Sequence, residues 1–122
     1  MPTNEKRGVL VSIAAAGMRA ADGSVLANGT LKFFEGGTTT PPATPVPKKV
    51  WKYRDKRTQW NPALPGAGNE VLLDPNGRRV AGVDIDGVYA DGVYDIEVYN
   101  SASALQYTIK DFFASHEIVN VK

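Results

Sequence analysis

One short run of this sequence, residues 30–35, constrains the fold most, because strand-forming residues there have a turn signal on each side. The run reads Thr-Leu-Lys-Phe-Phe-Glu and contains the β-branched and aromatic residues that strands favour. The dipeptides Asp22-Gly23 and Asn28-Gly29 precede it, and both contain residues that tolerate the positive φ of tight turns. Gly36 follows it. The sequence therefore predicts a strand bounded by hairpin turns.

Similar strand-like segments recur along the chain, with turn signals about every 8 to 12 residues, which is typical of sandwiches and barrels. The clearest hairpin spans residues 93–110, with residues 100–103 as its turn. Residues 14–21 are rich in alanine, but Gly17 interrupts them, so one helical turn is the most that we expect there. We expect an all-β fold, an antiparallel β-sandwich of about seven or eight short strands with at most one short helix. The predicted strands are residues 9–13, 30–35, 50–54, 70–73, 79–85, 93–99, 105–110 and 118–121.

Length and composition predict one domain. A chain of 122 residues with 43% hydrophobic residues can bury a core without disulfides, and it contains no cysteine. Residues 1–8 are polar and cannot fold by themselves, so we expect a flexible N-terminal arm followed by a single β-sandwich domain over residues 9–122.

Charge and hydropathy argue against two classes of partner. Fourteen basic and thirteen acidic residues give a net charge of +1, which is too balanced for binding nucleic acid through its phosphates. The apolar run at residues 9–16 has eight residues, too few for a signal peptide with its cleavage site or for a membrane span. We therefore expect no nucleic acid and no membrane among the partners.

Catalytic motifs are missing from the sequence. His116 is the single histidine, and there is no nucleophile elbow, metalloprotease helix or phosphate-binding loop. A lone histidine near the end of a β-rich chain is more often a surface residue than a general base, so we assign His116 no role. We expect no enzymatic activity and no cofactor.

An acidic cluster is the best candidate for a cation site. Asp84 and Asp86 precede Gly87, and Asp91 and Asp95 follow, which resembles half of a calcium-binding loop. No glutamate stands at the bidentate position, so we favour a glycine turn with solvated acids on one strand face and predict no metal site. Whether Asp84, Asp86 and Asp91 bind a cation stays open.

A basic run with interleaved aromatic residues raises the alternative of a stacking site for single-stranded nucleic acid. Alternation along a strand would put Trp51 and Tyr53 on one face and Lys52 and Arg54 on the other. We therefore interpret the aromatic residues as facing a core or an interface and the cations as facing solvent. The run consists of Lys48, Lys49, Lys52, Arg54, Lys56 and Arg57, with Trp51, Tyr53 and Trp60 between and after them.

Seven pieces of sequence between about residues 20 and 112 carry a family resemblance through their order rather than through any single piece. They are Asn28-Gly29, residues 31–34, Gly37-Thr38-Thr39-Thr40-Pro41, residues 50–55, Asn61-Pro62, residues 72–78 and residues 92–99. In this order they resemble phage tail proteins, namely the head-binding domains of tailspikes and the N-terminal domains of tail fibres. The resemblance implies a small β-sandwich that attaches to a virion and forms trimers. In those proteins glycan cleavage belongs to a long following region, and this chain stops at Lys122, which also argues against an enzyme.

The function expected from this resemblance is that of a non-enzymatic phage virion structural protein, a tail adaptor or a module that docks a fibre or spike onto the particle. Expected partners are other virion proteins (tail, portal or fibre/spike subunits) and further copies of the chain, with a trimer favoured. The expected location is the virion, with the tail favoured, after assembly in the host cytoplasm. The alternatives are a capsid decoration protein and a carbohydrate-binding β-sandwich module.

Candidate contact residues come from segments without an evident core role. The N-terminal arm is one, and residues 41–47 are the other, because preordered segments lose little entropy on binding. Residues 41–47 belong to the proline-rich residues 38–47, here called the proline loop. The large aromatic residues after the loop are also candidates, since interfaces are enriched in Trp and Tyr; the alternative is that they fill the core. The candidate interface residues are Pro2, Thr3, Lys6, Arg7, Pro41, Pro42, Pro45, Pro47, Trp51, Tyr53 and Trp60.

Overall fold

The computed structural model describes residues 9–11, 17–56, 58–60, 68–82, 85 and 87–114. Within these residues all regular structure is β, and no helix occurs. This confirms the all-β class. The strands are β1 (Val9–Leu10), β2 (Thr30–Glu35), β3 (Glu70–Leu72), β4 (Tyr89–Ala90), β5 (Gly92–Tyr99) and β6 (Leu105–Ala114).

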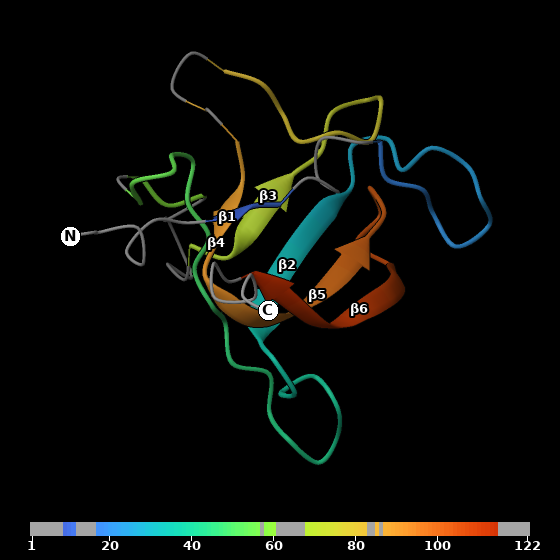
Figure 1. Cartoon of the computed structure of the whole chain (residues 1–122). Helices are drawn as coiled ribbons and strands as arrows, with labels where there is room; N and C mark the ends of the chain where they lie inside the picture. The colour runs from blue at the N-terminus through green and yellow to red at the C-terminus, as the bar shows by residue number, and fades with distance from the viewer. Residues whose placement is uncertain are drawn as a thin grey trace, which may run out of the picture.

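Four of these strands form one open antiparallel sheet in the order β3-β2-β5-β6 (Figure 1). β2 lies at its centre, so that Leu31 faces Val71 on one side and Val98 on the other. The Asn28-Gly29 turn leads into β2, with Asn28 at a φ of 57°. A side chain at Gly29 would lie 2.4 Å from the carbonyl oxygen of Tyr99, so the strands approach closely there. β1 and β4 pair separately.

The hydrophobic core covers one face of this sheet. β2 and β5 contribute residues two positions apart, such as Leu31 and Phe33 from β2, because alternate side chains of a strand point to the same face. Residues from β1, β4 and the connections pack against them. The buried core residues are Val11, Met18, Leu26, Leu31, Phe33, Val50, Trp60, Val71, Leu73, Val88, Ala90, Tyr94, Ile96 and Val98. The opposite face, here called the outer face, carries Lys32 and Glu97.

Several predicted strands are confirmed. Residues 30–35 form β2, residues 93–99 lie in β5, and residues 105–110 lie in β6. The predicted hairpin is confirmed as well: Asn100 N donates to Ala104 O at 3.0 Å, and the Asn100 side chain accepts from Ala102 N and Ala104 N. Three of the four residues predicted as strand 70–73 form β3. Local alternation and turn chemistry were sufficient for these elements.

Other predicted strands are not regular strands. Residues 50–54 contribute only isolated bridges at Trp51, and the described residues 79–82 and 85 contribute only one, between Arg79 and Leu73. Residues 17–21, the described part of the alanine-rich segment, form no helix. Leu10 is 52% exposed whereas Val11 is 1% exposed, so of these two neighbours only Val11 belongs to the core. Residues 118–121 lie outside the described part of the chain.

The described part of the chain contains no helix that is long and apolar enough to cross a lipid bilayer.

Candidate functional site

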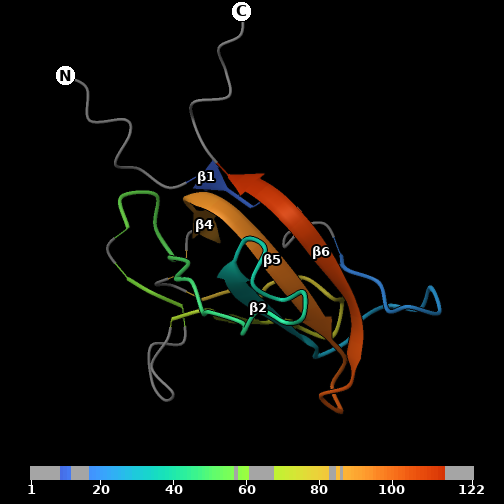
Figure 2. The same cartoon turned by 90° about the horizontal axis from the view of Figure 1, so that it is seen from below.

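The proline loop extends beyond the end of β2 and returns along its edge (Figures 1 and 2). Glu35 N donates to Val46 O at 2.7 Å and Lys48 N donates to Phe33 O at 3.1 Å, so residues 46–48 lie beside the second half of β2. Pro47 stands opposite Phe34 in this pairing. Proline has no backbone N–H, and at an edge position it therefore blocks further strand pairing without leaving a donor unpaired.

A buried carboxylate holds the start of the loop. Asp95 lies on the outer face of β5, is 0% exposed, and receives four hydrogen bonds. Its Oδ2 accepts from Thr39 Oγ1 at 2.7 Å, Gly37 N at 3.0 Å and Thr39 N at 3.3 Å. Its Oδ1 accepts from Asp111 N on β6 at 3.0 Å. One side chain thus ties the loop to β5 and β6.

These contacts explain the acidity of Asp95. Burial raises the pKa of the carboxyl group, but the hydrogen bond from Thr39 Oγ1 and those from the backbone of Asp111, Gly37 and Thr39 outweigh it and lower the pKa to about 2. Asp95 is therefore ionised at neutral pH and accepts charge-assisted hydrogen bonds from the loop.

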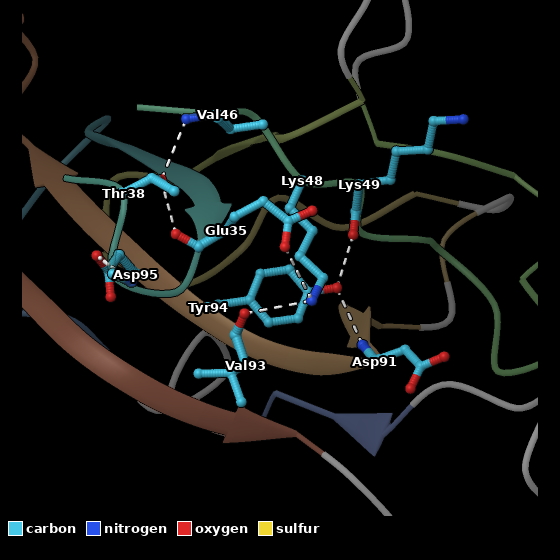
Figure 3. A network of polar contacts seen from close by, with 10 residues as sticks. Glu35, Thr38, Val46, Lys48, Lys49, Asp91, Val93, Tyr94 and Asp95 are labelled. Carbon is cyan, nitrogen blue, oxygen red and sulfur yellow. Dashed lines mark hydrogen bonds and ion pairs between the residues drawn. The ribbon is translucent and has the colours of Figure 1, made fainter. Parts of the chain in front are cut away.

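Thr38 joins the two ends of the loop. Its hydroxyl donates to Glu35 O at 2.7 Å and accepts from Val46 N at 3.1 Å (Figure 3). From β6, Lys110 Nζ also hydrogen-bonds to Thr40 Oγ1. The base of the loop is thus crosslinked by side chains although it contains no strand of its own.

The four prolines of the candidate interface all lie on the surface. Pro41, Pro42, Pro45 and Pro47 are exposed, as are the residues between them, and the Pro41-Pro42 bond is cis. Val46 is also exposed. The loop therefore has an anchored base, to which Val46 and Pro47 belong, and an apolar, solvent-facing tip at Pro41, Pro42 and Pro45.

The aromatic candidates are placed differently from one another. Trp60 is 3% exposed, belongs to the core, and donates its indole N–H to Gly87 O at 3.0 Å. Its placement favours the alternative that it fills the core. Trp51 and Tyr53 are half-buried. Trp51 bridges to Tyr89 of β4 and to Gln59.

The predicted separation of aromatic residues and cations onto two faces is wrong in detail. The chain turns after Trp51: Lys52 N donates to Thr58 O at 2.7 Å, Lys56 N donates to Tyr53 O at 2.9 Å, and Lys56 has a φ of 63°. Strand alternation therefore stops there. Lys52 Nζ lies 5.5 Å from the centre of the Trp60 ring and Lys56 Nζ lies 5.0 Å from the centre of the Trp51 ring. These cations sit over the rings.

Tyr94 holds the segment that follows the proline loop against β5 (Figure 3). Its hydroxyl donates to Lys49 O at 2.8 Å and accepts from Asp91 N at 2.9 Å. Burial raises the pKa of this hydroxyl, so it stays protonated. Lys48 Nζ lies 4.6 Å from the ring centre, 3.2 Å from Val93 O and 3.6 Å from Glu35 Oε1. The return of the loop is thus packed on β5.

The acidic cluster is only partly described. Asp84 and Asp86 lie outside the described residues. Asp91 forms an ion pair with Lys56, with Oδ2 and Nζ 2.5 Å apart. Asp95 is buried, so its interpretation as a solvated acid is wrong; the loop covers that part of the outer face. Among the described residues no group of three potential metal ligands lies together.

The remaining candidates fall outside the described residues. These are the arm residues Pro2, Thr3, Lys6 and Arg7, together with His116. On the described surface there is also a shallow pocket of about 280 Å³ lined by Asp74, Arg78, Arg79 and Ala81. The Asp74 carboxylate accepts from Asn76 N at 2.8 Å and from Arg78 N at 3.1 Å, and so stabilises its own turn.

Sequence reasoning missed Asp95 as the residue that positions the loop. Asp95 lies on the outer face because it alternates with the buried Ile96, but nothing in the local sequence indicates that this part of the face is covered. The signal that was available is the Gly37-Thr38-Thr39 sequence, because a glycine followed by two threonines offers backbone and hydroxyl donors that need an acceptor.

No family model matches this chain, and a search of the curated proteins finds no match either.

Proposed function

We propose that this protein is a non-enzymatic structural component of a phage virion, which docks a fibre or spike onto the particle and contacts its partner through the tip of the proline loop. The observation that carries the proposal is the contrast within the loop: the base is bonded to a buried carboxylate, whereas all four prolines face solvent. An ordered segment with exposed apolar rings has little conformational entropy left to lose on binding. The sequence resemblance to phage tail proteins supplies the virion context.

We also propose how the strands of the domain are layered. The domain is a small β-sandwich whose second layer forms around the β1–β4 pair and Val50. Support comes from the core, in which Val11, Val50, Val88 and Ala90 pack against the β2–β5 side of the sheet.

The proposal also covers the assembly. The protein is a homo-oligomer, with a trimer favoured. It is assembled in the host cytoplasm and binds other virion proteins at the tail. Nucleic acid and membranes are not its partners. The edges of the sheet support self-association, because β3 and β6 are its edge strands and oligomers commonly cover such edges.

Incorporation into particles tests the docking proposal. The intact tagged chain is produced during infection by the phage that encodes it, and purified particles are examined by immunoblot and gold labelling. We expect labelling at the tail. Replacing Pro41, Pro42, Pro45 and Pro47 with serine should leave the melting temperature nearly unchanged and reduce incorporation by about tenfold or more, as loss of interface anchors does. The matched control is Pro75→Ser, an exposed proline in another turn.

The outcomes separate the alternatives. Absence of the intact chain from particles, or normal incorporation of the folded serine variant, would contradict the proposal. Label spread over the capsid would instead support a decoration protein. Glycan binding that disappears in Trp51→Ala would support a carbohydrate-binding module.

The N-terminal arm is tested in the same assay. Residues 1–8 carry three charges and no apolar residue after Met1, and at about 3.3 Å per residue they could reach roughly 25 Å, enough to contact a neighbouring subunit. Deleting residues 2–7 should leave the melting temperature unchanged and weaken incorporation. A lower melting temperature, or full incorporation, would show that the arm does not dock.

A further inference from the structure

The outer face of the sheet is open at the end opposite the proline loop, and an apolar row crosses it there. Cross-strand pairing places Leu72, Thr30 and Tyr99 side by side on this face, and Leu105 of β6 pairs with Tyr99 across a shift in register. Leu72 is 46% exposed and Leu105 is 51% exposed. Among the described residues, the loop covers only the part of the face around Asp95. Two leucines beside an aromatic ring on an uncovered face mark a contact surface.

A negatively charged row lies next to the apolar one. Glu70, Lys32, Glu97 and Thr108 are neighbours across the four strands. Lys32 Nζ lies 3.8 Å from the Glu70 carboxylate and 4.7 Å from the centre of the Tyr99 ring. Glu97 accepts a hydrogen bond from Tyr99 Oη at 2.5 Å and has no ion pair with a described residue. Two carboxylates against one ammonium group leave this row negative.

Residues 48–56, here called the basic segment, carry the opposite charge. Within the segment, Lys48 and Lys56 are paired with Glu35 and Asp91. The other three cations, Lys49, Lys52 and Arg54, form no ion pair with any carboxylate that the structure describes. Lys52 is held over the Trp60 ring, which fixes its position, and the Lys49 side chain points away from the Tyr94 network (Figure 3). The segment therefore carries a net positive charge, since Asp55 is its single acidic residue, and Lys52 within it is fixed in position.

The two surfaces lie at opposite ends of the molecule. Figures 1 and 2 both show the green stretch that contains the basic segment on one side, and the beginning of β2, the end of β5 and the β5–β6 hairpin on the other. The two surfaces of one copy therefore cannot meet each other. The charges along the row are negative at Glu70, positive at Lys32 and negative at Glu97. If the negative rows of two copies packed on each other without an offset, carboxylates would therefore face carboxylates and ammonium groups would face ammonium groups. Such a symmetric pairing is unfavourable.

We propose that the outer-face rows of one copy bind the basic segment of a second copy, so that the chain self-associates head to tail. Glu70 and Glu97 then face Lys52 and Arg54 of the neighbour, while Leu72, Tyr99 and Leu105 pack on its aromatic residues. A contact between two different surfaces generates a ring if the rotation closes. This inference rests on the self-association included in the proposed function, but it does not depend on the virion location.

Charge reversal on the intact purified chain tests the pairing, with light scattering over a concentration series as the measurement. We expect Glu70→Lys with Glu97→Lys, and separately Lys52→Glu with Arg54→Glu, to weaken self-association by about tenfold or more, since like charges then face each other across the contact. All four substitutions in one chain restore opposite charges and should recover association to within a few fold. The charge-preserving pairs Glu70→Asp with Glu97→Asp and Lys52→Arg with Arg54→Lys are the controls.

If a charge-reversed variant does not fold, variants with neutral side chains at the same positions test the same contact. Glu70→Gln with Glu97→Gln should weaken association and make it less sensitive to salt. The inference is wrong if the intact chain is monomeric, if either reversed pair associates normally, or if the folded fourfold variant does not recover. Normal association of the reversed pairs would leave the proposed homo-oligomer standing and move its interface elsewhere. A monomer that still enters particles through the proline loop would leave only the docking proposal standing.

Discussion

Two segments between β2 and β3 are held in place by different interactions. The proline loop has no residue in the hydrophobic core and depends on the buried Asp95 carboxylate. Residues 50–56 and 58–60 place Val50 and Trp60 in the core, and Lys52 and Lys56 lie over aromatic rings. A loop without apolar residues in the core can therefore still be ordered, provided that the sheet beneath it supplies a hydrogen-bond acceptor shielded from water.

The comparison predicts that the second segment is more sensitive to loss of apolar area. Trp60→Ala removes a buried ring and leaves a cavity, and we expect a loss of roughly 3 to 5 kcal/mol in the free energy of unfolding, measured with urea. Trp60→Phe retains most of the ring and loses the bond to Gly87 O, at a cost of about 1 kcal/mol. A loss below about 1 kcal/mol for the alanine variant would mean that core packing does not hold this segment.

Loss of the carboxylate should instead loosen the proline loop selectively. Asp95→Ala leaves the backbone N–H groups of Gly37, Thr39 and Asp111 without their acceptor, and we expect a loss of about 3 kcal/mol. Amide exchange at Gly37 and Thr39 should rise strongly, whereas Trp60→Phe should leave it unchanged. The control Asp95→Asn keeps one acceptor oxygen and should have an intermediate effect. Unchanged exchange in Asp95→Ala would show that the loop does not depend on the carboxylate.

Acid should weaken the proline loop before the second segment. The pKa of Asp95 falls from 3.8 to about 2 on folding, so its contribution is complete above about pH 4 and is lost as the pH falls toward 2. At roughly 1.4 kcal/mol per pKa unit the contribution is about 2 kcal/mol. The free energy of unfolding of Asp95→Asn, measured by urea from about pH 5 to pH 2, should therefore fall less steeply than that of the intact chain. Parallel curves would contradict the assignment.

The surface ion pair of the second segment should have the smallest effect. Lys56 and Asp91 are partly exposed, so we expect Lys56→Met to cost less than about 1 kcal/mol, including the lost contact with the Trp51 ring. A double-mutant cycle with Asp91→Asn isolates the ion pair, and its coupling energy should shrink in high salt. A coupling energy between Lys56 and Asp91 that is large and independent of salt would show that this ion pair holds the segment in place.

Local sequence was sufficient for the central strands. β2 lies between the Asn28-Gly29 turn and Gly36, and the β5–β6 hairpin has Asn100 in its turn, as predicted. The same reasoning failed for residues 50–54, where Lys52, Arg54 and Lys56 look like the solvent side of a strand. There the chain turns, and Lys52 N donates to Thr58 O instead of to a long partner strand. The alternation of residues along a segment does not show whether a partner strand lies beside it.

The all-β class, β2 and the β5–β6 hairpin were predictable from the sequence, since they follow from turn chemistry and the two-residue period of a strand. The burial of Asp95 was not predictable in this way, because its cover comes from residues 56 and 58 positions earlier in the chain. Only the tertiary structure decided that Trp60 fills the core while Trp51 stays half-exposed. Whether a residue is buried depends on which segments, distant in the sequence, pack together. Neither strand propensity nor the alternation of residues along a strand indicates those contacts.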